Sequence, residues 1–185
     1  MGRWEPNARG RLEEAALALY GERGYEQVTV AEIAARAGLT ERTFFRHYAD
    51  KREVLFAGSG LLREILVKGV AEAPASAAPI DVVAAALAGA GALLEERREL
   101  ARARQVVIDA NPELQEREVV KLATLATEVA GALRDRGVAE PAASLAAQTG
   151  IAVFRVAFES WVGDTGRREL PDIVRECFAE LGTLI

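Results

Sequence analysis

The sequence predicts an all-α protein with about nine helices, in which a small N-terminal helical domain precedes a larger C-terminal helical domain. Half of the 185 residues are hydrophobic, and most of these are Ala, Leu and Val, a mixture that favours packed helices. Apolar residues recur three and four positions apart, and helix-capping residues flank these segments. We place the domain boundary after residue 55, which gives the domains 1–55 and 56–185.

The first two helices are predicted from their apolar faces and caps. The face of the first helix consists of Leu12, Ala16, Leu19 and Tyr20. Gly24 then breaks the pattern, as a C-terminal cap does. Thr29 and Glu32 have the spacing of a capping box and open a second helix. Its inner face is predicted to be Val30, Ile33, Ala34 and Ala37.

A third helix follows after a short turn. Gly38 ends the second helix, and Thr40 can cap a helix over Glu41–Tyr48. Two short helices around the turn 37–40 form the pattern of a helix-turn-helix, in which the second helix enters the major groove of DNA. Asp50 and Glu53 repeat the capping box and predict a fourth helix that continues to about Ala73.

The remaining helices lie in the second domain. Pro74 and Pro79 bracket a predicted loop. The helices that follow are expected from about Asp81, around Leu100–Ile108, from Asn111–Pro112 to Arg136–Gly137, from Pro141 to Trp161, and over Leu170–Leu184. No strand pattern, repeat or disordered tail is evident.

The charge distribution separates the two domains. The net charge of −5 is unusual for a nucleic-acid-binding protein. Residues 1–55 contain nine Lys or Arg and nine Asp or Glu, so the acidic excess lies in residues 56–185. No apolar run approaches the roughly 20 residues of a membrane span, and the N-terminal segment lacks the apolar stretch of a signal peptide. We therefore expect a cytoplasmic protein. The lone Cys177 is interpreted as a half-buried helical thiol.

The segment VTVAEIAARAGLTERTFFRHYADKREVLF, which ends at Phe56 and follows an amphipathic helix, closely resembles the TetR family of transcriptional regulators. The resemblance implies a helix-turn-helix DNA-binding domain with three helices, a linking fourth helix and a divergent helical body. That body binds a small effector and forms a homodimer. Repressor is the usual role in this family, although an activator would differ only in where its operator lies.

The third helix is expected to have an inner and a DNA-facing side. Phe44 and Tyr48 lie four residues apart and are predicted to be core. Arg42 and Arg46 share another side, which is either an ordinary solvated surface or, given the resemblance, the surface that contacts double-stranded DNA. Arg42 can bind a guanine edge, Glu41 can accept from cytosine, and Thr40 and Thr43 can contact phosphate or a thymine methyl.

The resemblance also implies phosphate contacts by Thr29, His47 and Lys51. His47 would otherwise be a surface histidine or a catalytic base without a visible partner. Phe45 occupies a place where the family commonly has Tyr, and without the hydroxyl it is expected to pack against sugar. Arg3, Arg9 and Arg11 form a short basic arm that could add phosphate or minor-groove contacts.

The body contains an apolar stripe formed by Val153, Phe154, Ala157, Phe158 and Trp161. Its residues are interpreted either as core or as a dimer seam with the last helix, through Ile173, Val174, Phe178 and Leu181. Symmetric pairing would suit a palindromic operator.

The effector site is predicted from polar residues that lie within apolar helices. Arg102, Gln105, Arg155 and Glu159 are polar residues within apolar helices, which could orient a ligand or form surface or dimer salt bridges. The predicted ligand-binding residues are Arg102, Gln105, Phe154, Arg155, Phe158 and Trp161. The body, including ARARQVVIDANPELQERE, is similar to the mycofactocin-type regulators, which implies a long acyl chain or its coenzyme A thioester as effector.

The sequence also bears on two other classes of function, an enzyme and a protein-interaction module. With one His, one Cys, no Gly-rich phosphate loop and no metal-ligand spacing, the sequence offers no catalytic, metal or cofactor site, so we expect no enzyme. A helical protein-interaction module without specific DNA binding is the alternative that the acidic charge and Phe45 permit.

Overall fold

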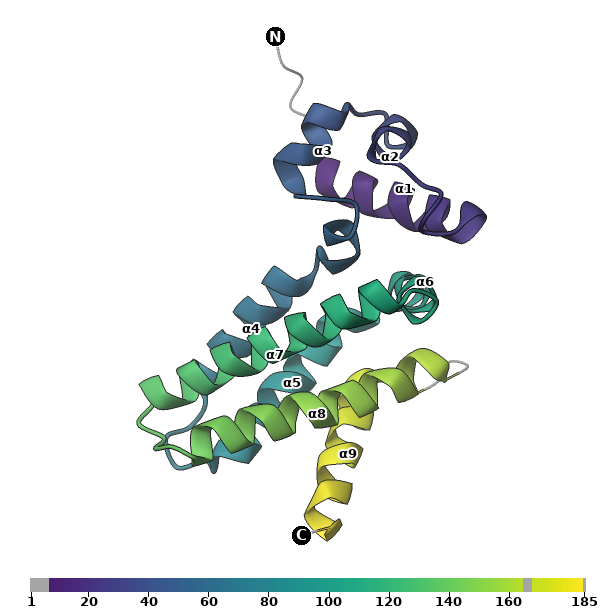
Figure 1. Ribbon diagram of the computed structural model, residues 1–185. Helices are drawn as coiled ribbons and strands as arrows, with labels where there is room; N and C mark the ends of the chain where they lie inside the picture. Colours follow the sequence, from purple (N-terminus) through teal and green to yellow (C-terminus); the bar gives the residue numbers. More distant parts are fainter. Residues whose placement is uncertain (1–6, 165–167, 185) are drawn as a thin grey trace. The chain divides into compact units, whose positions relative to one another are not determined.

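The computed structural model describes residues 7–164 and 168–184, which contain nine α-helices, one 3-10 helix and no strand (Figure 1). The predicted all-α fold is confirmed. The elements are α1 (Ala8–Arg23), α2 (Val30–Arg36), α3 (Glu41–His47), the 3-10 helix η1 (Glu53–Phe56), α4 (Ser59–Glu72), α5 (Pro79–Glu95), α6 (Arg98–Asp109), α7 (Pro112–Asp135), α8 (Ala142–Gly163) and α9 (Leu170–Leu184).

The chain forms two compact units, which we call the head and the body. The head runs to Gly58 and also contains Arg102–Glu116, the corner where α6 meets α7. The body comprises Ser59–Ala101 and the chain from Arg117 onward. The sequence placed the boundary after residue 55 and assigned the α6–α7 corner to the second domain. Thus α6 and α7 are continuous helices that have residues in both units.

The capping residues determine where the helices of the head begin. The Thr29 and Thr40 hydroxyls accept backbone hydrogen bonds from Glu32 and Thr43, so α2 and α3 begin where the sequence predicts. Gly24, with φ 83°, follows the end of α1. This conformation suits glycine because a side chain there would be strained. The helix α1 begins at Ala8, earlier than its apolar face suggests, because the Asn7 side chain accepts from the Gly10 N–H.

The prediction of one continuous fourth helix from Asp50 to Ala73 was wrong. Asp50 Oδ1 accepts from the backbone N–H groups of Arg52 at 2.8 Å and Glu53 at 3.1 Å, so the predicted cap closes a tight turn. That turn leads into η1, and α4 begins only at Ser59. Gly58 precedes this start and Gly60 follows it, and glycine favours helix less than other residues do.

Helix α5 occupies the centre of the body and packs against α4, α8 and α9. Val83 and Leu87 on α5 belong to one hydrophobic cluster with Phe154 and Trp161 on α8. The two helices approach closely at Gly150, where an added Cβ would lie 2.2 Å from Val83 Cγ1. Helix α9 has the predicted bounds and adds Leu170, Ile173 and Val174 to the cluster. None of the described helices combines the length and apolar character needed to cross a membrane.

Candidate nucleic-acid interface

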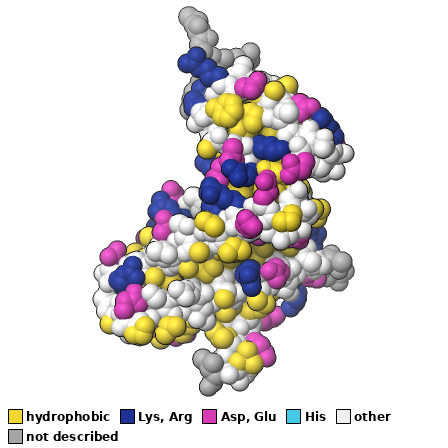
Figure 2. All heavy atoms as spheres, viewed as in Figure 1, with side chains coloured by type: hydrophobic (Ala, Val, Ile, Leu, Met, Phe, Trp, Pro, Cys, Tyr) yellow, Lys and Arg dark blue, Asp and Glu magenta, His cyan; other side chains and the backbone are white. Residues whose placement is uncertain are grey.

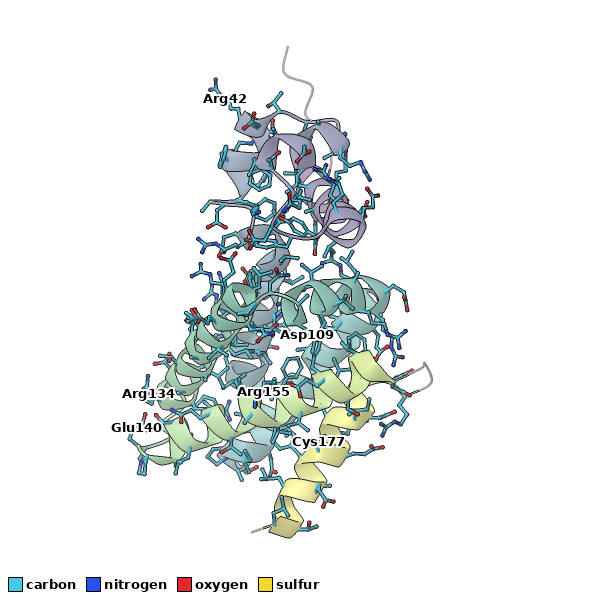
Figure 3. All side chains as sticks on the ribbon, turned by 45° about the vertical axis from the view of Figure 1, so that its right-hand side comes forward. Arg42, Asp109, Arg134, Glu140, Arg155 and Cys177 are labelled. Carbon is cyan, nitrogen blue, oxygen red and sulfur yellow. The ribbon has the colours of Figure 1, made fainter. Side chains whose placement is uncertain are left out.

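Helix α3 has one buried and one exposed side. Phe44 and Tyr48, at its C-cap, are 0% and 4% exposed and hold it against the head. On the other side lie Arg42, Phe45 and Arg46, all exposed, and Figure 3 shows the Arg42 side chain projecting away from the head. Two guanidinium groups and an aromatic ring thus occupy one outward surface, which suits contacts to phosphates and base edges.

The start of α3 presents hydroxyl groups to the same exposed region. Thr40 Oγ1 accepts from the Thr43 N–H at 3.2 Å and lies 3.1 Å from Thr43 Oγ1. Glu41 is exposed beside them. Of the nine predicted DNA-binding residues, seven therefore lie on α3 or at its cap, namely Thr40, Glu41, Arg42, Thr43, Phe45, Arg46 and His47.

Lys51 and Thr29 use their donors inside the head. Lys51 Nζ donates to the carbonyl oxygens of Tyr25 at 2.9 Å, Val28 at 3.2 Å and Glu26 at 3.3 Å. It also lies 4.3 Å from the centroid of the Tyr25 ring. An ammonium has three hydrogens to donate, so this geometry favours a role in fixing the α1–α2 loop over direct phosphate contact.

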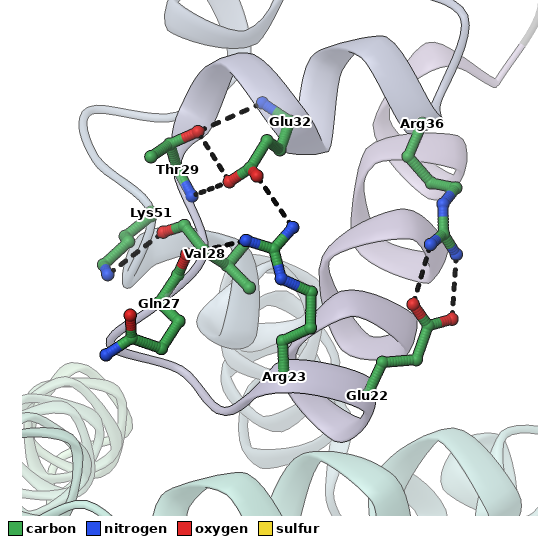
Figure 4. A network of polar contacts seen from close by, with 8 residues as sticks. All are labelled: Glu22, Arg23, Gln27, Val28, Thr29, Glu32, Arg36 and Lys51. Atoms are coloured by element: carbon green, nitrogen blue, oxygen red, sulfur yellow. Dashed lines mark hydrogen bonds and ion pairs between the residues drawn. The ribbon is translucent and has the colours of Figure 1, made fainter.

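Thr29 is held within the polar network drawn in Figure 4. Its hydroxyl and backbone N–H donate to Glu32 Oε2 at 2.8 and 2.9 Å, and Arg23 Nη1 donates to Glu32 Oε1 at 2.7 Å. Hydrogen bonds from the Thr29 N–H and from Arg23 lower the pKa of Glu32 to about 2. Arg36 on α2 binds both carboxylate oxygens of Glu22 on α1, at 2.7 and 3.0 Å. These contacts fix α2, and with it the turn into α3.

Two arginines of the predicted basic arm, Arg9 and Arg11, make contacts inside the head. Arg9 Nη2 donates to the Ala57 carbonyl at 2.7 Å, and its guanidinium lies 5.7 Å from the centroid of the Tyr48 ring. Arg11 donates to the Ala37 carbonyl at the helix-turn-helix turn. Arg3 lies outside the described residues. The two described arginines therefore support α3 from behind.

His47 lies exposed at the C-terminal end of α3. Burial of part of the ring and the nearby Arg46 and Arg9 guanidinium groups lower the pKa of His47 below 6.5. The imidazole is therefore neutral at pH 7, and a phosphate beside it would favour the charged form.

Sequence reasoning missed the contacts between the α6–α7 corner and the rest of the head. Arg104 Nε donates to the Leu55 carbonyl at 2.6 Å, and its guanidinium lies 5.1 Å from the centroid of the Phe56 ring. Burial and a hydrogen bond to the Glu113 carboxylate raise the pKa of Tyr25. The hydrogen-bonded partners Arg104 and Leu55 are 49 residues apart in the chain, so local patterns could not reveal them.

The apolar stripe of α8 is core within a single chain. Phe154 and Trp161 are 5% and 0% exposed, and Phe158 packs against the same cluster. Of the two interpretations made from the sequence, core is the one that describes the buried residues Val153, Phe154, Ala157, Trp161, Ile173 and Val174. The ring centroids of Phe154 and Phe158 lie 6.0 Å apart, and those of Phe158 and Trp161 5.5 Å apart, so the three rings form an aromatic row.

The polar residues predicted to orient a ligand are divided between the two units. Arg102 and Gln105 belong to the head, where Gln105 Nε2 donates to Asp109 Oδ1 at 2.8 Å. Arg155 and Glu159 have exposed side chains and form a 3.8 Å ion pair along α8, and Figure 3 labels Arg155 on this helix. In the single chain, Arg155 and Glu159 therefore form a surface salt bridge, which is one of the interpretations made from the sequence.

Comparison with known proteins gives two family matches that share no residues. Residues 12–57 match the profile described as bacterial regulatory proteins, tetR family. Residues 77–184 match the profile described as MftR C-terminal domain. Among curated proteins, the HTH-type transcriptional regulator TcmR of Streptomyces glaucescens is 35% identical over 78 residues. That match spans 42% of this chain and 34% of the length of TcmR.

Solved structures share the fold over nearly the whole chain. FadR of Bacillus subtilis, in complex with stearoyl-CoA, has a TM-score of 0.66 at 21% identity, covering 95% of this chain and 98% of its own. FadR of Thermus thermophilus, in complex with lauroyl-CoA, has a TM-score of 0.58 at 23% identity, covering 94% and 92%. SmeT, the repressor of a Stenotrophomonas maltophilia multidrug efflux pump, has a TM-score of 0.61 at 20% identity, covering 95% and 89%.

The Lys51 contacts generate a stability prediction. Lys51→Met should destabilise the head by about 1–2 kcal/mol, because charge-assisted hydrogen bonds to three carbonyls are lost. All three tyrosines, Tyr20, Tyr25 and Tyr48, lie in the head, so their near-UV circular dichroism during urea unfolding reports on this unit. Lys68→Met is the control, since Lys68 is exposed and pairs with Glu72 at 3.8 Å. Equal unfolding midpoints for the two variants would contradict the assigned role of Lys51.

Proposed function

Because the chain belongs to the TetR family of transcriptional regulators, we propose that it is a homodimeric repressor that binds a palindromic operator and is released by an acyl effector. The observation that supports DNA binding most strongly is the two-sided helix α3. Phe44 and Tyr48 hold the helix from within, while Arg42, Phe45 and Arg46 remain exposed beside the capped turn. The alternative of an interaction module without DNA leaves this basic outward surface without a role.

We assign separate tasks to the predicted DNA-binding residues. Arg42 reads a guanine edge, Glu41 and Thr43 add contacts to neighbouring bases, and Phe45 packs against sugar or a thymine methyl. Thr40, Arg46 and His47 contact phosphate and set the register. Thr29 and Lys51 act mainly by holding α2 and the α1–α2 loop in place, because their donors are used within the head.

The proposed dimer uses the exposed side of α8. Leu145, Ala152 and Val156 lie seven and four residues apart on one exposed helical face, and Leu145 and Val156 are 61% and 55% exposed. Figure 2 shows hydrophobic side chains gathered over this part of the body. Symmetric pairing of two such faces would bury them and give two recognition helices for the two half-sites of a palindrome.

The proposed effector is an acyl chain or its coenzyme A thioester. The MftR C-terminal domain profile covers residues 77–184, and two structures of similar fold were solved with lauroyl-CoA and stearoyl-CoA. The aromatic row on α8 and the surrounding apolar cluster suit the chain of such a ligand.

We further propose that effector binding reaches DNA through the α6–α7 corner. Because α6 and α7 each have residues in both units, a shift of their body segments moves the contacts that Arg104 makes with Leu55 and Phe56. Those residues form η1, which directly follows the recognition region. An effector that prefers the shifted state would misplace two half-site readers that must stand about 34–36 Å apart.

The first test is selection of bound sequences from a random DNA pool at about 150 mM salt, where nonspecific attraction is weak. We expect a palindromic motif. Arg42→Ala should lose about 1–3 kcal/mol of discrimination at one position of each half-site. Glu99→Ala, at an exposed residue in the first turn of α6, is the control and should leave the motif unchanged. Absence of any enriched motif from a folded dimer would favour the interaction-module alternative.

DNA affinity should depend on pH through His47. If a phosphate raises the pKa of His47, binding takes up a proton, so affinity increases as pH falls through the bound-state pKa and levels off below the depressed pKa of free protein. Titrations of operator DNA between about pH 8 and pH 5.5 measure this. His47→Gln should flatten the profile, and an unchanged profile in that variant would remove His47 from the phosphate contacts.

The dimer proposal is tested by charge substitution on α8. Val156→Glu should convert the dimer to a monomer. Symmetric pairing would bury the introduced carboxylate of each copy without a cationic partner. Sedimentation equilibrium measures the assembly state. The matched control is Val119→Glu on α7, since Val119 is 58% exposed and Val156 is 55% exposed. A dimer retained in Val156→Glu but lost in Val119→Glu would place the interface on α7.

Coupling is tested at Arg104. Arg104→Met removes the hydrogen bond to Leu55 but keeps an apolar stem near Phe56. Lauroyl-CoA should weaken operator binding by about 5- to 150-fold in the parent protein, and by less than about fivefold in this variant. Arg63→Met, which breaks a 3.8 Å surface pair with Glu128, is the control. The same fold-release in all three proteins would show that the corner does not carry the coupling.

A further inference from the structure

Two buried hydrogen-bond donors lie together in the body. Trp161, near the end of α8, is fully buried. The Arg98 guanidinium, at the start of α6, lies 5.1 Å from the centroid of the Trp161 ring, and Arg98 Nη2 donates to the Trp161 carbonyl at 3.0 Å. The Arg98 side chain is 15% exposed. These contacts fix the guanidinium against the indole.

Both residues retain a buried N–H group without a hydrogen-bond partner. The two atoms are Arg98 Nε and Trp161 Nε1. Buried polar groups are nearly always paired, since leaving one unpaired costs more than an ordinary hydrogen bond returns. Neither side chain can accept a hydrogen bond. The chemistry that would satisfy this pair of donors is therefore an acceptor oxygen.

The charges around Arg98 indicate which kind of acceptor fits. Arg98 Nη2 lies 3.7 Å from Asp164 Oδ2, so the positive charge already has a partner. Arg168 pairs with Glu176 at 2.9 Å and also lies 4.0 Å from Asp164. A second buried carboxylate at Arg98 would have to share one guanidinium with Asp164, which is costly. A neutral carbonyl oxygen can satisfy the donors without this cost.

The residues that lie on the same side of α8 as Trp161 are apolar. Phe154, Phe158 and Trp161 form the aromatic row, and Leu94 and Ala101 near Arg98 pack against the same cluster. Trp161 both belongs to this row and carries one of the two donors, so apolar contacts and an unpaired N–H meet at one residue. A molecule with one neutral carbonyl at the end of an alkyl chain has this pattern.

We propose that Arg98 Nε and Trp161 Nε1 bind the carbonyl oxygen of a neutral acyl derivative, such as a thioester, in preference to the carboxylate of a free fatty acid. The inference rests on the proposed acyl effector and adds the group by which it is recognised. Phe154, Phe158 and Trp161 then contact the chain, while Arg98 and the Trp161 indole recognise the acyl group.

The test compares lauroyl-CoA with S-dodecyl-CoA, the thioether that lacks only the carbonyl oxygen. Trp4→Phe leaves Trp161 as the single tryptophan, since the chain has two, so its emission reports on the site. We expect lauroyl-CoA to bind about tenfold more tightly than the thioether. It should also shift the emission to longer wavelength, and laurate should bind more weakly than lauroyl-CoA.

Variants assign the difference to the two donors. Arg98→Lys keeps a cation near Asp164 but loses Nε, and Trp161→Phe keeps an aromatic ring but loses the indole N–H. Each should reduce the tenfold thioester preference to about twofold or less. Phe158→Leu, in the neighbouring apolar row, is the control and should weaken both ligands while preserving their ratio. If Trp161→Phe does not fold, Arg98→Lys alone decides.

Equal affinity of the parent protein for lauroyl-CoA and S-dodecyl-CoA would overturn the carbonyl assignment while leaving an acyl effector in place. Tighter binding of laurate than of lauroyl-CoA would overturn the preference for a neutral acceptor. A thioester preference that survives Arg98→Lys would also overturn the assignment. Failure of all three ligands to bind, or to release operator DNA, would instead overturn the proposed acyl effector and this inference with it.

Discussion

The recognition helix depends on packing rather than on its own stability. Helix α3 has seven residues, and isolated helices of this length are not stable in water. The burial of Phe44 and Tyr48 and the Thr40 cap therefore determine whether Arg42 and Arg46 keep fixed directions. Arg9, Arg11 and Lys51 reinforce this packing through backbone carbonyls. A substitution behind α3 would thus affect DNA binding without touching DNA.

The head and the body share two helices, α6 and α7. Because Arg102–Glu116 belongs to the head, the head contains the corner of two helices whose remaining residues lie in the body. Arg104 binds the Leu55 carbonyl, and Glu113 hydrogen-bonds Tyr25, whose own carbonyl accepts from Lys51. A short chain of contacts therefore connects the corner with the loop that positions α2.

Local chemistry made much of the fold predictable. The Thr29 and Thr40 caps, the Gly24 stop and the bounds of α9 follow from side chains within a few residues of each helix end. The same reasoning failed at Asp50, because a cap satisfies backbone donors equally well in a tight turn and in a helix. For the apolar stripe of α8 it left core and dimer seam open, since an apolar stripe does not record what covers it.

The site was predictable only where its residues lie on one helix. The outward residues of α3 follow from periodicity and family resemblance, whereas the pairing of Arg98 with Trp161 joins residues 63 positions apart. The role of Lys51 changed for a related reason. Lys51 has the residue type of a phosphate contact, but its donors are used by Tyr25 and Val28, more than 20 residues away. Thr29 donates to Glu32 within the capping box, so its hydrogen bonds are local.

Several Lys and Arg side chains form hydrogen bonds within the head, and this limits how strongly a single head can bind DNA. Arg9, Arg23, Arg36, Lys51 and Arg52 make hydrogen bonds within the head, while Arg42 and Arg46 extend from the exposed side of α3. Few phosphate contacts per head give a weak interaction with a shallow salt dependence, because that dependence scales with the number of phosphates contacted. Two heads joined in the proposed dimer bind far more tightly, because the second contact is intramolecular. A coupling of only about 1–3 kcal/mol that misplaces one head would then suffice to release the operator.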